Sequence, residues 1–226
     1  FLVININIFI RNIFSIFTHY AESESENQDF TKEQLEIFEK VTENYKKYKL
    51  HSACSAASIA LPEAQGEIIR IGLAFYGLWP SEPTKRRAWM SQVCLQPLMT
   101  WKTKVIQVKE LKKDDTIGYN RSYKCDKPCK VVVLPIGYNE GYDRLLSNNA
   151  EVLIKGERCP VRGNICMNLT MVEIPNDLEV EVGEVVTLLG TDSGQNISAD
   201  DLATKCQTIN YEIVTRINPN LSRLIV

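Results

Sequence analysis

The chain has 226 residues, of which 44% are hydrophobic and 24% are charged, as is ordinary for a globular protein of one or two domains. Its formal net charge of −2 and its isoelectric point near 5.8 argue against nucleic acid as a partner. Seven cysteines are scattered along the chain, with only two histidines. We therefore expect reduced thiols in a cytoplasmic protein, and no metal site.

The first seventeen residues are dominated by Phe, Ile and Asn. Asparagines and Arg11 interrupt the apolar run, so we do not expect a membrane span, and the basic start and cleavage site of a signal peptide are missing. Residues 4–8 alternate as in a strand. Because Phe, Ile and Asn share AT-rich codons, our preferred interpretation of residues 1–17 is an anomalous segment translated from non-coding sequence.

Residues 30–48 have the apolar spacing of an amphipathic helix. Thr31 and Gln34 have the spacing of a capping box, in which a hydroxyl accepts a hydrogen bond from a free backbone N–H at the helix start. We expect one face of this helix to lie in the core, and that face consists of Leu35, Phe38, Val41, Tyr45 and Tyr48.

Two apolar segments follow, and both are predicted as strands. Residues 50–57 run into small side chains, and residues 68–77 contain a glycine near their middle. With the preceding helix they give the rhythm of part of an α/β unit. Too few strands fit between residues 15 and 80 to close an eight-stranded barrel. Residues 79–93 hold two prolines and a basic run, and we predict a linker there.

The composition then shifts to short apolar segments separated by Gly, Asn, Asp and Pro, which is typical of an antiparallel β domain. The predicted strands are residues 100–108, 130–136, 151–155, 167–174 and 184–189. Ser198, with Asp201 three residues later, predicts the start of a helix with a capping box.

Two segments resemble the C-terminal half of alanine racemase. They are Val-Leu-Pro-Ile-Gly-Tyr-Asn-Glu-Gly-Tyr-Asp-Arg at residues 133–144 and Gly-Asn-Ile-Cys-Met-Asn at residues 163–168. The resemblance implies an α+β fold, in which the remnant of a (β/α)8 barrel that binds pyridoxal 5′-phosphate (PLP) precedes a mainly antiparallel β domain. The expected divisions are residues 1–17 (anomalous), 18–93 (partial barrel and linker) and 94–226 (C-terminal β domain).

Tyr138 follows an apolar strand and precedes Gly141, so a sharp turn is expected to present its side chain at the strand end. A phenol has a pKa near ~10 and acts as a base only beside positive charge or a suitable hydrogen-bond partner. The residues alone favour a packed turn residue. The resemblance implies instead that Tyr138 moves the Cα proton of alanine on one face, while a lysine serves the other. Tyr142 is the weaker candidate.

The second segment is implied to bind substrate. Met167 would offer its backbone amide to the substrate carboxylate, with Cys166 beside it. A nucleophilic Cys166 is the rival interpretation, but no histidine or other base is placed near it in the sequence. Asn164 and Asn168 stand where many members of the family have Arg and Asp, which bears on substrate access and rate.

Other short segments resemble the family's cofactor site. His-Ser-Ala-Cys-Ser at residues 51–55 implies that Ser55 bonds the PLP phosphate, although Cys54 replaces an Asn. Arg-Ile-Gly-Leu at residues 70–73, with Ile71 in place of a Pro, implies phosphate contacts from the backbone N–H groups of Gly72 and Leu73. Arg70 would lie at the pyridine nitrogen, which suits racemisation.

Three further residues complete the implied site. His19, in Thr-His-Tyr-Ala, would hydrogen-bond the catalytic tyrosine, and His51 would support the cofactor residues. Tyr211, in Thr-Ile-Asn-Tyr-Glu, would reach the phosphate and narrow the entrance. Taken singly, a histidine is more often structural, Gly72 is a bulge and Arg70 a buried structural partner. Their order along the chain favours the resemblance.

The family attaches PLP to a lysine in a stretch of the type Lys-Ala-Asn-Ala-Tyr-Gly, and no such stretch occurs in this sequence. Covalent attachment of PLP is therefore not expected in this chain as given, and whether it is an enzyme is left open. The missing early strands are expected to leave apolar surface exposed.

The leading interpretation is the C-terminal portion of a PLP-dependent alanine racemase, an isomerase that interconverts L- and D-alanine for peptidoglycan synthesis and works as a homodimer. The first alternative is a truncated, non-catalytic remnant, or a module that needs a partner chain to supply the lysine. A carrier that only binds PLP is a further alternative, and serine is an alternative substrate.

Overall fold

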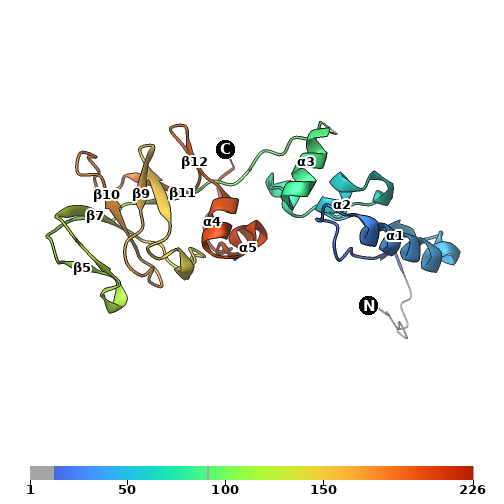
Figure 1. The fold of residues 1–226 in the computed structure, drawn as a ribbon, viewed down its shortest axis with the longest axis horizontal. Helices are drawn as coiled ribbons and strands as arrows, with labels where there is room; N and C mark the ends of the chain where they lie inside the picture. Colours follow the sequence, from blue (N-terminus) through green and yellow to red (C-terminus); the bar gives the residue numbers. More distant parts are fainter. Residues whose placement is uncertain (1–12, 91, 226) are drawn as a thin grey trace. The chain divides into compact units, whose positions relative to one another are not determined.

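A computed structural model describes residues 13–90 and 92–225, so the predictions for residues 1–12 lie outside the described residues. The chain divides into two compact units between Leu98 and Met99. Figure 1 shows that helices α1 to α3 belong to the first unit and that most of the strands belong to the second. We describe each unit by itself.

The first unit is built around two parallel strands with a helix between them in the chain. Phe17 pairs with His51 in the register of these strands, and an isolated parallel bridge joins Cys54 to Arg70. The elements are β1 (Ser15–Phe17), α1 (Asp29–Thr42), η1 (Glu43–Tyr45), β2 (Lys49–His51), α2 (Ser55–Ala60), η2 (Pro62–Ala64), η3 (Leu73–Tyr76) and α3 (Glu82–Met90), where η denotes a 3₁₀ helix.

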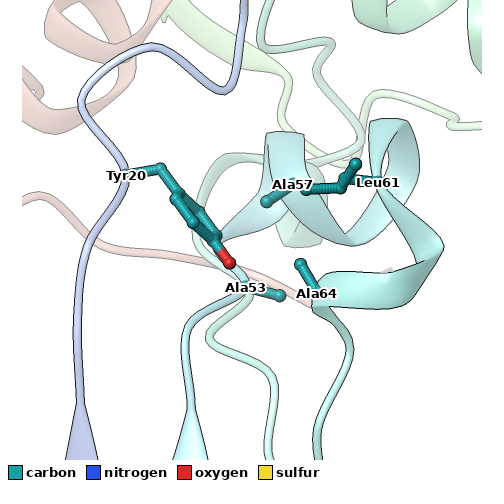
Figure 2. Close-up of a cluster of buried hydrophobic side chains, with 5 residues drawn as sticks. All are labelled: Tyr20, Ala53, Ala57, Leu61 and Ala64. Carbon is teal, nitrogen blue, oxygen red and sulfur yellow. The ribbon is translucent and has the colours of Figure 1, made fainter. Parts of the chain in front are cut away.

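Small side chains form the core of this unit. Figure 2 shows the Tyr20 ring directed toward Ala53, Ala57, Leu61 and Ala64, and all five residues are buried. The Tyr20 hydroxyl donates to Ser52 Oγ at 2.9 Å, which donates in turn to the Ala64 carbonyl at 3.1 Å. The buried phenol is thereby hydrogen-bonded, as a polar group in a core must be.

The first helix departs from its prediction in two ways. Its N-cap is Gln28 without a side-chain cap, whereas Thr31 is buried within the helix and its hydroxyl has no partner among the described residues. Gln34 instead accepts the Ala21 N–H at 2.9 Å. The predicted core face was wrong in part, because Leu35 packs on the Tyr20 cluster but Val41 and Tyr45 are exposed.

Three other predictions for this unit need correction. The strand predicted at residues 50–57 ends at His51, because the small residues that follow form α2. Residues 68–77 contribute a single bridge at Arg70 and then turn into η3. The linker predicted at residues 79–93 contains α3, since Ser81 precedes it and its hydroxyl accepts the Thr84 N–H at 3.2 Å.

The second unit is a β domain in which every described strand pairing is antiparallel. Its elements are β3 (Trp101–Lys104), β4 (Gln107–Leu111), β5 (Thr116–Ile117), η4 (Tyr119–Arg121), β6 (Tyr123–Lys124), β7 (Cys129–Leu134), η5 (Arg144–Leu146), β8 (Glu151–Ile154), β9 (Glu157–Pro160), β10 (Thr170–Ile174), β11 (Val185–Asp192), β12 (Gln195–Ile197), α4 (Ala199–Lys205) and α5 (Asn210–Arg216).

The buried strands of this unit belong to two sheets. One has the order β10-β7-β4, and the other has the order β12-β11-β8-β9 with β3 also paired to β11. The predicted strand 100–108 was wrong in being continuous: near Val105 the chain leaves the second sheet and enters the first, so it forms β3 and β4.

The remaining predictions for this unit hold within a few residues. β7, β8, β10 and β11 overlap the predicted segments, although β7 begins one residue earlier and β11 runs on to Asp192. The capping box at Ser198 is confirmed, since its side chain accepts the Asp201 N–H at 3.0 Å and the Asp201 carboxylate accepts the Ser198 N–H at 2.9 Å.

The two units together confirm the α+β fold class. Among the described residues no helix is long and apolar enough to cross a membrane.

Candidate functional site

A tight loop follows β7 and presents Tyr138. The Gly141 N–H donates to the Tyr138 carbonyl at 3.2 Å, and the Tyr142 N–H donates to the Gly137 carbonyl at 3.0 Å. These bonds turn the chain sharply at the strand end. The Tyr138 side chain is 45% exposed, which leaves its phenol accessible to a small molecule.

The loop lies against the turn that contains Cys166 and Met167. The Tyr138 N–H donates to the Cys166 carbonyl at 3.2 Å, and the Asn139 N–H donates to the Met167 carbonyl at 3.0 Å. A Cβ added at Gly137 would lie 2.0 Å from the Cys166 oxygen, so only glycine allows this approach. The structure thus brings together the predicted residues Tyr138, Cys166 and Met167.

Met167 carries an unused hydrogen-bond donor. Met167 is 55% exposed, and its backbone N–H makes no hydrogen bond to any described residue. A backbone N–H without a partner in the described part of the chain, on a turn that is hydrogen-bonded to the Tyr138 loop, is suited to bind a small carboxylate. The amide therefore has the chemistry expected of the predicted substrate contact.

The rival interpretation of Cys166 finds no support in its surroundings. Burial raises the pKa of its thiol, and the nearby Arg144 only partly offsets this effect. The thiol lies 3.6 Å from the Asn164 carbonyl, and no histidine or carboxylate is hydrogen-bonded to it among the described residues. Since the thiolate is the nucleophile, this environment disfavours nucleophilic catalysis.

Tyr142 is a core residue. Its side chain is 1% exposed and meets the Trp101 ring edge-on, with centroids 6.0 Å apart. Burial raises the pKa of its phenol well above the ordinary value. It therefore has no access to a substrate, and Tyr138 is the better candidate of the two.

Glu140 is a residue of this site that the sequence analysis missed. Its carboxylate accepts hydrogen bonds from the Gly137 N–H at 2.8 Å, from Asn139 Nδ2 at 3.0 Å and from Asn168 Nδ2 at 2.8 Å. Burial opposes its ionisation, but these donors outweigh burial and hold the pKa of the carboxyl below its usual value. A carboxylate two residues after the tyrosine, within a glycine-flanked turn, was the signal available in the sequence.

The helix that carries Tyr211 ends on the same loop. The Asn218 N–H, just after α5, donates to the Glu140 carbonyl at 3.1 Å, and a Cβ at Gly141 would lie 2.4 Å from the Arg216 oxygen. Tyr211 itself is half-buried near the start of α5. Its predicted contact with the phosphate stays a prediction, because the predicted cofactor residues belong to the first unit.

Arg70 is the centre of the cluster in the first unit. Its two terminal nitrogens donate to the carbonyls of Thr18 (2.7 Å), Ser52 (3.1 Å) and His51 (3.3 Å). Its guanidinium also lies 5.0 Å from the Phe17 ring centroid. Its Nε–H has no acceptor among the described residues, so a fixed cation keeps one donor for a ligand.

The two predicted histidines both contact Arg70. The Nδ1 atom of His51 lies 2.7 Å from one terminal nitrogen, and the Nδ1 atom of His19 lies 3.2 Å from the other. Burial first, and then the charge of Arg70, lower the pKa of His51, which keeps this imidazole neutral and able to accept. His19 is exposed, and its predicted bond to Tyr138 stays a prediction.

The predicted phosphate ligands also lie together. Ser55, the first residue of α2, accepts the N–H groups of Gly72 at 2.9 Å and Ala74 at 3.3 Å on its Oγ. A Cβ added at Gly72 would meet no atom within 4 Å, so open space adjoins this amide, whereas Leu73 is buried. The Gly72 N–H is taken up by the Ser55 hydroxyl in this structure, so a phosphate bound here would replace that hydroxyl as its acceptor.

All seven cysteines are free. Cys125 and Cys129 are buried with their sulfurs 3.7 Å apart. Within the described ranges, no group of three His, Cys, Asp or Glu side chains is arranged to hold a metal ion.

Comparisons with known proteins point to one family along most of the chain. A family model described as alanine racemase, N-terminal domain, matches residues 10–80, and one described as alanine racemase, C-terminal domain, matches residues 98–225. The curated alanine racemase of Methylacidiphilum infernorum is 42% identical over 212 residues, which are 94% of this chain and 53% of the relative. The chain thus spans about half the length of the curated relatives it matches.

Solved structures give the same result for the fold. The alanine racemase of Bacillus anthracis with bound L-Ala-P has a TM-score of 0.83 and 32% identity, over 90% of this chain and 53% of that chain. The alanine racemase of Bartonella henselae with covalently bound pyridoxal phosphate has a TM-score of 0.81 and 24% identity, over 95% and 57% of the two chains. At 24% identity the second match shows the fold alone.

Proposed function

The chain belongs to the alanine racemase family, and we propose that it forms the C-terminal portion of a PLP-dependent racemase that interconverts L- and D-alanine. The observation that carries this proposal is the pairing of an exposed tyrosine with a free backbone N–H. Tyr138 and Met167 lie on two loops that are hydrogen-bonded to each other. This pairing supports one group that moves a proton and one that holds a carboxylate.

In this proposal Tyr138 is one of two acid/base groups. Its phenolic oxygen takes the Cα proton of alanine on one face in one direction and returns it in the other direction. The Met167 N–H donates to the alanine carboxylate and so fixes the distance between Cα and the phenol. The exposure of Tyr138, together with the burial of Tyr142, supports this choice of tyrosine.

The first unit would hold the cofactor. When bound, PLP withdraws electrons from the Cα–H bond and thereby acidifies it. Ser55 and the N–H groups of Gly72 and Leu73 would hold its phosphate, and Tyr211 would reach the phosphate as well. Arg70 would donate to the ring nitrogen, which stays unprotonated because the guanidinium does not release its proton.

The group on the other face of the substrate is a lysine from outside these 226 residues, supplied by another segment or chain. Active sites shared between two subunits, expected from the resemblance, make a homodimer the functional form. In this proposal the racemase acts in the cytoplasm and supplies D-alanine for peptidoglycan.

A mixing experiment tests the proposal. The chain is co-expressed with the full-length Bacillus anthracis relative, in which the tyrosine corresponding to Tyr138 is changed to Phe, and D-alanine formation from L-alanine is measured. The chain is expected to restore activity by supplying Tyr138. The matched control is the same chain with Tyr138→Phe, which is expected to restore none.

Failure has a defined meaning in this experiment. If isolated mixed dimers form no D-alanine above that control, the chain is a non-catalytic remnant rather than a racemase module. Activity restored equally by the Tyr138→Phe chain would show that the restoring group is not Tyr138.

A further inference from the structure

The carboxylate of Glu140 is the point where the two loops of the candidate site are joined by side chains. Oε2 accepts the Gly137 N–H from its own loop, and Oε1 accepts Asn168 Nδ2 at 2.8 Å from the facing turn. Asn139 Nδ2 also donates to Oε1 at 3.0 Å. Three donors therefore converge on one carboxylate, and charge-assisted bonds of this kind are the strong ones.

This bridge spans the backbone bonds on which the site depends. Among the described residues, the backbone bonds between the loops are those from the Tyr138 N–H to the Cys166 carbonyl and from the Asn139 N–H to the Met167 carbonyl. Both Tyr138 and Met167 are substantially exposed, so little side-chain packing fixes their separation. The Glu140–Asn168 contact encloses these two bonds and limits the motion of one loop against the other.

We propose that Glu140 and Asn168 form a matched pair of positioning residues that holds the Tyr138 phenol in register with the Met167 amide. The role of the pair in catalysis depends on the proposed racemase function, whereas its role in fixing the loops does not. The pair also explains why an amide occupies position 168. Asn168 donates, whereas an aspartate there would place a second carboxylate at hydrogen-bond distance from Glu140, and two such groups do not both ionise.

A swap of the pair tests this proposal in the intact chain. The variants are Asn168→Asp, Glu140→Gln and the two combined, and Asn176→Asp is the control because it adds the same charge at an exposed position of the same unit. The measurement is amide hydrogen exchange at Tyr138 and Asn139. Amides of β7 and β10, such as those of Val132 and Val172, report whether each variant is folded.

We expect Asn168→Asp to accelerate exchange at Tyr138 and Asn139 at least ~10-fold. This factor corresponds to the free energy lost with one hydrogen bond to a charged group. Glu140→Gln alone should have a smaller effect, because an amide oxygen still accepts. In the combined variant the new amide at position 140 donates to the new carboxylate at position 168, so the exchange rates should return toward those of the unaltered chain. The β7 and β10 amides should keep their protection throughout.

The same variants in the mixing assay show whether the pair acts in catalysis. Asn168→Asp is expected to lower D-alanine formation ~10-fold, and the combined variant to recover most of that loss. Two results would overturn the proposal that Glu140 and Asn168 act as a pair. One is equal exchange rates in Asn168→Asp and Asn176→Asp, and the other is faster exchange in the combined variant than in either single variant. If no mixture is active but the exchange pattern is as expected, the racemase proposal fails and the positioning pair stands.

Discussion

Tyr138 and Tyr142 are four residues apart, yet the structure gives them opposite environments. Tyr138 lies at the exposed tip of a turn, whereas Tyr142 is buried beside Trp101. The same turn causes both results, because its hydrogen bonds direct one ring outward and the other into the core. Residue type alone does not distinguish the two tyrosines, whereas the burial of their side chains does.

The Tyr142 hydroxyl is buried without a hydrogen-bond partner among the described residues. A buried donor in this state destabilises the fold, so Tyr142→Phe is expected to raise the free energy of unfolding by about 1 kcal/mol. Urea unfolding followed by circular dichroism measures this change. Tyr138→Phe, at an exposed position, should leave the same transition unchanged, and a loss of stability in Tyr142→Phe would show that the hydroxyl has a partner.

The ionised state of Glu140 predicts a pH dependence. Its pKa is lowered in the folded chain, so its contribution to stability is present above the unfolded pKa of ~4.3 and is lost as pH falls through the lower, folded value. The nearby charges of Asp143 and Arg216 pair with each other at 3.1 Å. The difference in unfolding free energy between the chain and Glu140→Gln should therefore shrink on acidification below pH ~4, and a constant difference would contradict this account.

At the scale of single residues, the sequence itself indicated the turn of Tyr138, whereas the roles of the Met167 amide and of the cluster around Arg70 came from the family resemblance and stay predictions. Glycines near a tyrosine predict a turn through local backbone freedom. The role of Glu140 was not predictable in this way. Its partners Gly137 and Asn168 are brought together by the pairing of β7 with β10, which is a non-local event.

At the scale of elements, short apolar segments between turn residues predicted strands such as β7 and β10. Residues 50–57 show the opposite case. Their small side chains suit either a strand or a helix, and packing of Ala57 on Tyr20 decides for α2. The split of residues 100–108 into β3 and β4 could not be predicted from the local sequence either, because each half pairs with a strand that is distant in the sequence.

Helix caps give a prediction at this scale. Ser198 makes both bonds of a capping box, so Ser198→Ala is expected to lower the unfolding free energy by about 1 kcal/mol. Thr31 has the same sequence signature but makes no such bond, so Thr31→Val should leave stability unchanged or raise it. Urea unfolding of both variants by circular dichroism distinguishes them, and an equal loss in the two would contradict the assignment of the caps.

At the scale of the whole molecule, the predicted site is divided between the two units. The tyrosine and the substrate amide belong to the second, whereas Arg70 and the phosphate ligands belong to the first. Both groups were predicted from short local motifs that resemble a known family, and the roles of their residues stay predictions.

The central claim is that Tyr138 moves the Cα proton on one face of alanine. The most direct test is exchange of the Cα hydrogen of each alanine enantiomer with solvent deuterium, measured in the mixed dimer with the relative that lacks its own tyrosine. The account predicts that both enantiomers exchange with the unaltered chain, and that only one does with the Tyr138→Phe chain. Equal exchange of both enantiomers with the Tyr138→Phe chain would contradict it.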